Sequence, residues 1–453
     1  MKHVFISIFI LIIFHESYCQ SDNGMGTPVD SSAKTSRCLA SPFPSPPFPM
    51  PDWCGGPVIG EANGDSPDYL MKSIQKMTKK PWTKWNNTGI LIYGWFDASI
   101  NRSSSKYTNT PMTYDFIPNK PVLDQAILHI ERPPDIEQTN HVSWGFLFDN
   151  IYGIDYRFTM AKGYLSDQLF KYNHIYGYDP TQFYGLLYVP HVGEGMLIKI
   201  GRFISPADIE AQWAPDNYLF SHSLMFGVDP YTFTGVNTTI RINKQMQFEL
   251  GIHGGNDMSP WCNSSQVNGL AMFRWVSKDN LESLYGGINS IGAGQYKNGH
   301  DDLQMLVLVW GVKFSERVHM MTESYYIWQY NAALGGTAIY GPEEYGQGGG
   351  IGPIIPGLSK AYGFVNYFQI LCSPKDYISI RNGALDDVNG SRTSFATWYT
   401  DHTIGWSHHF SDIFVIRPEI RYEQAWNNNN VTPYDAGTKK NQLSCATDLL
   451  INF

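Results

Sequence analysis

Apolar and polar residues alternate along most of the chain, in runs of roughly 9–13 residues that turn signals separate. In one run, Phe248, Leu250 and Ile252 alternate with Gln247 and Glu249. Successive side chains of a β-strand point to opposite faces, so each run gives a sheet one apolar and one polar face. The runs are longer than soluble strands and match strands that cross a bilayer at a tilt. The pattern predicts an all-β fold, a transmembrane antiparallel up-and-down β-barrel of about 16 strands, with a wet interior.

Two kinds of connection join the predicted strands. Short polar turns such as Asn243-Lys244 and Ser411-Asp412 alternate with long connections rich in Gly, Pro and Asn, such as 255–268 and 331–360. Short turns at one end and long loops at the other are typical of outer-membrane barrels. We therefore expect one barrel over residues 88–453.

Ten charged residues fall on the polar parity of their strands. We expect them to line a water-filled pore and to set its electrostatics. The alternative is that pairs such as Arg417 with Glu419 and Arg421 with Glu423 only solvate the inner wall. The ten candidates are His129, Glu131, Lys199, Arg241, Glu249, Arg381, Arg417, Glu419, Arg421 and Glu423.

The segment 205–217 follows a clear strand but does not alternate. One hypothesis is that it folds inward and narrows the pore, with Asp208, Glu210 and Asp216 facing the passage, which would favour cations. The alternative is an external loop or a rim helix, and Pro206–Trp213 is a candidate for a short helix.

The N-terminal residues have the pattern of a secretory signal peptide. A basic start precedes the apolar run Val4–Phe14, and Ser17 and Cys19 are small residues before a cleavage site. We expect residues 1–19 to be the signal, and 20–87 to be a disordered, Pro-rich periplasmic segment. Within that segment, Tyr69–Lys79 is the other candidate for a short helix.

The chain ends on an alternating strand that closes with an aromatic residue. Phe453, Ile451 and Leu449 share its apolar face. This ending looks like the signal by which the barrel assembly machinery of Gram-negative bacteria recognises outer-membrane barrels.

Several segments resemble one known family. They include Trp144-Gly-Phe146, Gly201-Arg-Phe-Ile-Ser205, Asp229-Pro-Tyr-Thr-Phe-Thr-Gly235 and Arg417-Pro-Glu-Ile-Arg-Tyr422. On these residues the chain resembles the bacterial "putative beta-barrel porin 2", or OmpL-like, family. The resemblance implies a single barrel in the bacterial outer membrane with a porin role. It carries no catalytic residues and does not fix the transported solute.

Composition and motifs limit the alternatives. The net charge of −9, with no basic block, argues against nucleic-acid partners. Five cysteines would follow the signal, an odd number, and whether Cys38 and Cys54 pair is left open. The histidines lack metal-ligand spacing, and no catalytic motif such as G-x-S-x-G or H-E-x-x-H occurs. We therefore expect no cofactor, no metal and no enzyme activity.

The sequence thus predicts an outer-membrane channel for passive diffusion of small hydrophilic solutes or ions. Its expected partners are outer-membrane lipid, the assembly machinery and the solutes, and a homo-oligomer is left open. Three alternatives stand beside it: a plugged structural or adhesive barrel, a barrel enzyme, and a soluble secreted β-protein that binds carbohydrate.

Overall fold

The computed structural model describes residues 58–61, 69–78, 82–165, 175–335, 352–426 and 431–453. Two helices precede the strands, α1 (Tyr69–Thr78) and α2 (Thr83–Asn86), and α1 confirms the helix predicted at 69–79. The predicted signal at 1–19 lies outside the described residues, as do Cys38, Cys54 and most of the segment 20–87.

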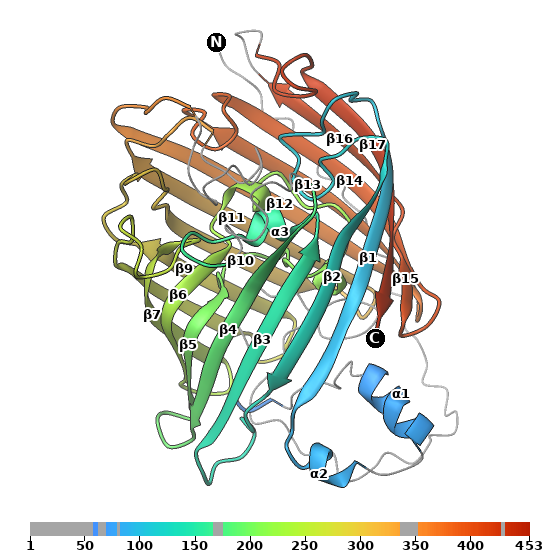
Figure 1. Cartoon of the computed structure of the whole chain (residues 1–453), viewed down its shortest axis with the longest axis vertical. Helices are drawn as coiled ribbons and strands as arrows, with labels where there is room; N and C mark the ends of the chain where they lie inside the picture. Colours follow the sequence, from blue (N-terminus) through green and yellow to red (C-terminus); the bar gives the residue numbers. More distant parts are fainter. Residues whose placement is uncertain (1–57, 62–68, 79–81, 166–174, 336–351, 427–430) are drawn as a thin grey trace. The chain divides into compact units, whose positions relative to one another are not determined.

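Strands are the main secondary structure in the rest of the described chain (Figure 1). They are β1 (Leu91–Ser103), β2 (Pro121–Arg132), β3 (Ser143–Gly153), β4 (Gly177–Val189), β5 (Met196–Ile204), β6 (Thr232–Arg241), β7 (Met246–Asn256), β8 (Asn268–Val276), β9 (Glu282–Ile291), β10 (Gln304–Lys313), β11 (Val318–Tyr330), β12 (Leu358–Ser373), β13 (Asp376–Asp387), β14 (Thr397–His409), β15 (Phe414–Ile416), β16 (Glu419–Trp426) and β17 (Asn441–Asn452). One-turn helices lie in the loops: α3 (Tyr156–Thr159), η2 (Ala214–Asp216) and η3 (Phe226–Val228).

The sheet closes on itself as an antiparallel barrel. Consecutive strands pair around the sheet, and β17 returns to pair with β1. Both β15 and β16 pair with β14 and with β17, so they are two halves of one strand, interrupted at Arg417 and Pro418. The seventeen strands therefore fill sixteen positions, which confirms the predicted strand number.

The connections separate by length as predicted. One end of the barrel carries short turns such as 242–245, 314–317 and 410–413, and the other carries long loops such as 257–267 and 292–303. The chain reaches β1 and leaves β17 at the end with the short turns (Figure 1). In an outer-membrane barrel, short turns face the periplasm and long loops face the outside.

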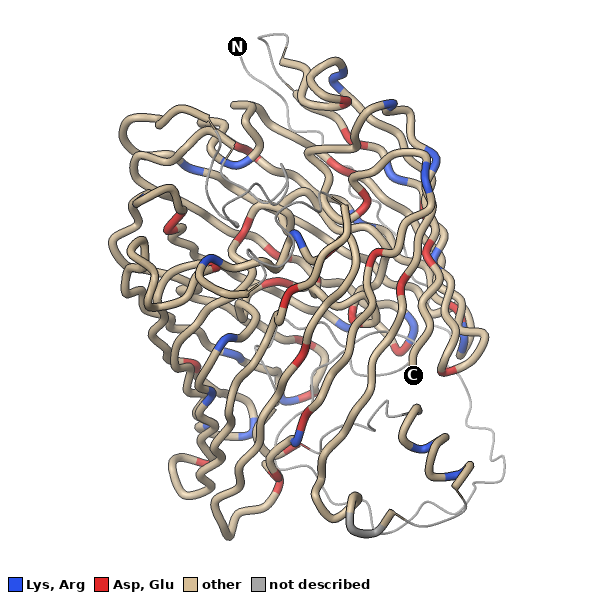
Figure 2. Tube along the Cα trace, viewed as in Figure 1, with Lys and Arg blue, Asp and Glu red and all other residues tan. Residues whose placement is uncertain are grey.

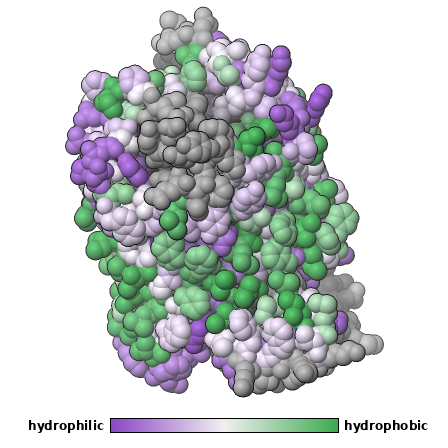
Figure 3. Space-filling view, viewed as in Figure 1, coloured by the Kyte–Doolittle hydropathy of each residue, from purple (hydrophilic) through white to green (hydrophobic). Residues whose placement is uncertain are grey.

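The outer wall is apolar. Outward side chains such as Ile100, Leu250, Ile252 and Trp144 are exposed, while their strand neighbours point inward and are buried. Hydrophobic residues cover the middle of the wall over β1–β5, and hydrophilic residues gather toward its ends (Figure 3). The wall therefore has the apolar band that a bilayer requires. Within the described residues, none of the helices is long and apolar enough to cross a membrane.

The inner face is not uniformly polar, which corrects the sequence prediction. Inward residues of β8–β12, among them Met272, Met305, Val307 and Met321, form an apolar cluster with Leu224 and its neighbours from the loop 205–231. This part of the interior is a packed core. The sequence of β10 could have indicated this packed core, because the strand is apolar on both of its faces.

Candidate functional site

The loop 205–231, here called the insert, enters the barrel interior. It leaves the end of β5 and returns to β6, yet it bonds to distant strands on other sides of the barrel. Ala214 N–H donates to the side chain of Gln125 on β2 (3.1 Å), and Ile209 N–H donates to Glu323 on β11 (2.8 Å). Ser221 N–H donates to Glu419 on β16 (3.1 Å). The insert thus crosses the interior, which confirms the inward fold and excludes the external loop or rim helix.

The predicted helix at Pro206–Trp213 is wrong. Asp208 has a left-handed φ of 84°, which a helix does not allow. The N–H groups of Ile209 and Ala211 bond to the side chains of Glu323 and Asn217 instead of backbone carbonyls one turn earlier. Side-chain acceptors therefore replace the helical hydrogen bonds.

Arg417 ties the insert to the wall near the β15–β16 interruption. Its guanidinium donates to the carbonyl oxygens of Ala214 (2.6 Å) and Asn217 (3.0 Å) and to the carboxylate of Asp448 (2.9 Å) on β17. Arg417 pairs with Asp448 rather than with Glu419, the partner that the alternative hypothesis gave it. A guanidinium offers five donors in a planar fork, so one side chain can hold both a carboxylate and a turn of backbone.

Two further arginines, on β13 and β16, act in the same way. Arg381 on β13 donates to Asp401 (3.1 Å) and to the hydroxyl of Ser221 (3.0 Å), and it also donates to the Ser221 carbonyl. Arg421 on β16 donates to the carbonyl of His222 and, as predicted, pairs with Glu423 (2.6 Å). Three arginines, one on β13 and two on the interrupted strand β15–β16, therefore hold one stretch of the insert.

All ten predicted pore-lining residues face the interior, and nine of them are buried. Only Glu131 keeps partial exposure. Some contacts lie away from the insert: Arg241 pairs with Glu194 (2.5 Å), Lys199 lies over the ring of Tyr184 (5.0 Å), and Glu249 accepts from Asn237 (3.2 Å). The strand parity was therefore predicted correctly, but most of these side chains contact protein rather than open water.

His129 shows how the inner wall and the insert pack together. Its ring lies against Trp95 (5.0 Å) and against Trp213 of the insert (5.4 Å), and it is 3.5 Å from the carboxylate of Asp149. Burial among aromatic rings makes it part of the packing.

The three predicted constriction acids take different positions. Glu210 is buried, accepts from the hydroxyl of Tyr367 (2.6 Å) and pairs with Arg381 (3.4 Å). Asp208 is buried beside Asp229, and burial followed by the charge of Asp229 raises the pKa of the Asp208 carboxyl well above its usual value. Asp208 and Glu210 therefore do not face an open passage, which corrects the sequence prediction. Asp216 is half-buried and keeps access to solvent.

A solvent-accessible acidic region remains where the insert meets β1 and β2. The hydroxyl of Tyr93 donates to Glu131 (3.0 Å), and Asp216 lies near enough to act electrostatically on the same hydroxyl. All three side chains are half-buried. Charges on the accessible inner face are the ones that a passing solute can meet.

Five buried arginines that face the interior each pair with a carboxylate. The matched pairs are Arg202 with Asp179, Arg381 with Asp401, Arg392 with Asp301, Arg417 with Asp448, and Arg421 with Glu423. In the described part of the chain, no cluster of three His, Cys, Asp or Glu side chains has an arrangement that could hold a metal ion.

A second loop completes the packing around the insert, and no pattern in the sequence indicates it. Tyr114, in the loop between β1 and β2, stacks on His222 (ring centroids 3.9 Å apart) and donates to Gln212 (2.5 Å). Burial lowers the pKa of His222 to about 3, so its imidazole is neutral. Isolated aromatic residues in a Pro- and Thr-rich loop carry no periodic signal, so only the structure reveals this contact.

A closed antiparallel barrel with one loop drawn inside it, an apolar outer band and charged inner walls defines a porin-type barrel of the bacterial outer membrane. The chain belongs to the family "Putative beta-barrel porin-2, OmpL-like", whose sequence model matches residues 89–453. Family membership makes the protein an outer-membrane, porin-like channel for passive diffusion of small hydrophilic solutes.

The likeness to one solved structure supports the fold. An anion-selective porin from Comamonas acidovorans is similar with a TM-score of 0.50 and 8% identity, over 80% of this chain and 99% of that one. The outer membrane channel DcaP of Acinetobacter baumannii has a TM-score of 0.46 and 10% identity, over 80% and 97%. OmpT of Vibrio cholerae has a TM-score of 0.44 and 9% identity, over 80% and 97%. No curated protein sequence matches this chain.

Proposed function

We propose that the channel prefers cations and that solutes pass beside the insert, along the face where Glu131 and Asp216 are accessible. The observation that carries this proposal is the position of these two half-buried carboxylates: Glu131 on β2 accepts a hydrogen bond from the hydroxyl of Tyr93, and Asp216 of the insert acts electrostatically on the same hydroxyl. A ring or pair of accessible carboxylates lowers the free energy of a passing cation and raises that of an anion.

The pairing of the buried arginines supports the same sign. Arg381, Arg417 and Arg421 each contact a carboxylate, so their positive charge is locally compensated. The accessible inner charge near the insert is therefore negative. Figure 2 shows acidic residues distributed along the strands of the barrel, with basic residues interspersed among them. The proposed function includes no chemical step on the solute.

The test is the reversal potential of single channels in a salt gradient. We expect wild type to prefer cations, and Glu131→Gln and Asp216→Asn together to bring the permeability ratio toward one while discrete conductance steps persist. Asp279→Asn is the control, because Asp279 is fully exposed in the turn between β8 and β9 and lies off the inner wall. A wild-type preference for anions, or a ratio that the double substitution leaves unchanged, would refute the proposal.

A plugged barrel is the second candidate, and the clamped insert favours it. The insert is held from β2, β11, β13 and β16 by bonds to Gln125, Glu323, Arg381 and Glu419, and most of its residues are buried. If the insert closes the passage at rest, the folded wild-type barrel will give no conductance steps in a planar bilayer.

A further inference from the structure

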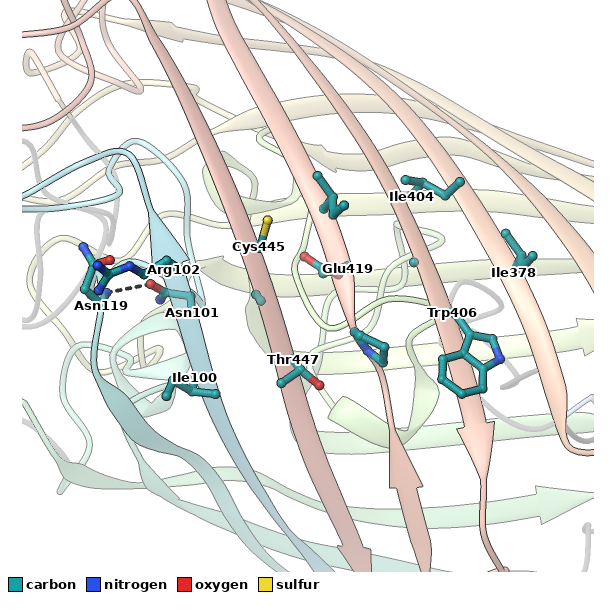
Figure 4. A pocket seen from close by; sticks show the side chains of 14 residues that line it. Ile100, Asn101, Arg102, Asn119, Ile378, Ile404, Trp406, Glu419, Cys445 and Thr447 are labelled. Carbon is teal, nitrogen blue, oxygen red and sulfur yellow. Dashed lines mark hydrogen bonds between the residues drawn. The ribbon is translucent and has the colours of Figure 1, made fainter.

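A hollow of about 700 Å³ lies on the outer wall, across β13, β14, β16, β17 and β1. Figure 4 shows Ile100 and Arg102 on β1, Cys445 and Thr447 on β17, and Trp406 on β14 around it. The apolar side chains that line it are outward-facing and exposed, Ile100 by 51% and Ile404 by 50%. The hollow is therefore open to the membrane and separate from the interior.

Side-chain size explains the hollow. On β17 the outward residues here are Cys445 and Thr447, which are small. Their neighbours in register are larger: Thr447 pairs with Ile100 on β1, and Cys445 pairs with Ile420 on β16. These two small side chains, each beside a larger isoleucine of a neighbouring strand, leave a trough in the wall.

The trough extends along the outer wall from the long-loop end of the barrel toward the short-turn end. Arg102 and Asn119 line it near the long-loop end of β1, whereas Ile378 lines it close to the short turn that begins β13. It thus has a polar end toward the outside and an apolar remainder. An outer-leaflet lipid has the same polarity, with its headgroup outside and its acyl chains toward the bilayer centre.

Basic side chains gather at the polar end. Arg102 and Lys106 are exposed, and Lys120 is exposed next to Asn119. Lys439 lies in the same patch, because its ammonium donates to the carbonyl of Ser104, two residues after Arg102.

One carboxylate, Asp435, is bound within this patch. It pairs with Lys439 (3.0 Å) and accepts from the backbone N–H of Lys106 (2.8 Å). Lys440 adds another basic residue beside Lys439. Figure 2 shows this concentration of Lys and Arg near the long-loop ends of β17 and β1. The patch is strongly basic in a chain whose net charge is −9.

We propose that the basic patch and the trough together bind one phosphate-bearing lipid of the outer leaflet. Arg102 and Lys106 contact the phosphate, because guanidinium and ammonium groups are the usual phosphate ligands. An acyl chain fills the trough over Cys445 and Thr447. Charge complementarity selects an anionic lipid from its neutral neighbours, and the apolar trough distinguishes a lipid from free phosphate.

Native mass spectrometry of the full-length protein in detergent tests this proposal. The probes are an acylated glucosamine disaccharide carrying two phosphates, the same lipid without phosphates, and inorganic phosphate. We expect wild type to bind the phosphorylated lipid most tightly. Each basic residue near an anionic lipid contributes about 1 kcal/mol, so Arg102→Gln with Lys106→Gln should weaken binding about thirtyfold. Cys445→Phe, which fills the trough, should weaken binding of the same lipid.

The matched control is Lys244→Gln with Lys278→Gln, two exposed lysines in short turns at the opposite end, which should leave binding unchanged. A gel-shift of the unheated barrel verifies that every variant is folded, and unaltered conductance separates this site from the pore. Equal affinity of wild type and Arg102→Gln/Lys106→Gln would overturn the proposal. So would equal affinity for the phosphorylated and unphosphorylated lipids, or binding of inorganic phosphate as tight as that of the lipid.

Discussion

At the scale of single residues, the position of the insert inside the barrel depends on arginines that donate to its backbone carbonyls. Arg417 contacts Asp448, Ala214 and Asn217, three groups that are distant in the sequence. Strand parity shows that Arg417 points inward, so its face could be predicted from the sequence. Its partners could not, because one comes from β17 and two from a loop without periodicity. The nearest acid on the same strand, Glu419, was the natural candidate, but it binds Ser221 instead.

Replacing Arg417 should therefore destabilise the barrel strongly. Arg417→Ala leaves the buried carboxylate of Asp448 without its cation, and breaking such a buried pair costs about 3–5 kcal/mol. Arg417→Leu with Asp448→Leu removes both charges and should recover part of that loss. The measurement is denaturant unfolding in detergent, followed by tryptophan fluorescence. Arg102→Gln, on the outer wall, is the control and should change stability little. Equal unfolding midpoints for Arg417→Ala and wild type would show that the contacts of Arg417 with Asp448 and the insert do not stabilise the barrel.

At the scale of elements, the strands and the insert differ in how much the sequence reveals. Each strand repeats the same contrast between an apolar and a polar face. The barrel, its strand number and the separation of short turns from long loops therefore follow from the sequence pattern. The insert is specified by single contacts, such as Ile209 with Glu323 and Ala211 with Asn217. Its inward path could be inferred from the missing alternation. Its backbone conformation could not, because those contacts depend on which strand faces it after the barrel has closed.

Removing residues 206–214 should raise single-channel conductance several-fold. This deletion takes away the part of the insert that bonds to Gln125, Glu323 and Arg381, and so clears space in the interior. If wild type gives no steps and the deletion gives stable ones, the insert closes the barrel at rest. The control shortens the loop 257–267 at the same end, which bonds to Lys162 and Gly163 of a neighbouring loop. A folded deletion variant with wild-type conductance would show that the insert does not limit the passage.

At the scale of the whole barrel, closure depends on one seam between the first and last strands. The backbone of Phe453 exchanges hydrogen bonds with Gly94 (2.8 and 3.1 Å), and its ring lies 5.1 Å from Phe96. Ile451 and Leu449 are opposite Phe96 and Ala98 in register. The residues predicted as an assembly signal thus form the outer, apolar face of the seam. A strand that must be matched last, to a partner far away in sequence, is a natural point for recognition during folding.

Phe453→Ser should consequently reduce the amount of assembled barrel in cells more than its effect on stability explains. Phe248→Ser is the matched control, because Phe248 is also an outward phenylalanine, placed on β7 away from the seam. Both substitutions lose apolar contact with lipid, so purified and refolded variants should show similar losses of stability. Only the seam variant should accumulate in cells as unfolded, protease-sensitive chain. At equal expression, the unfolded fraction is the protein whose gel migration does not change on heating. If the two variants assemble equally well, the terminal phenylalanine acts as an ordinary lipid-facing residue, and recognition must depend on other parts of β17.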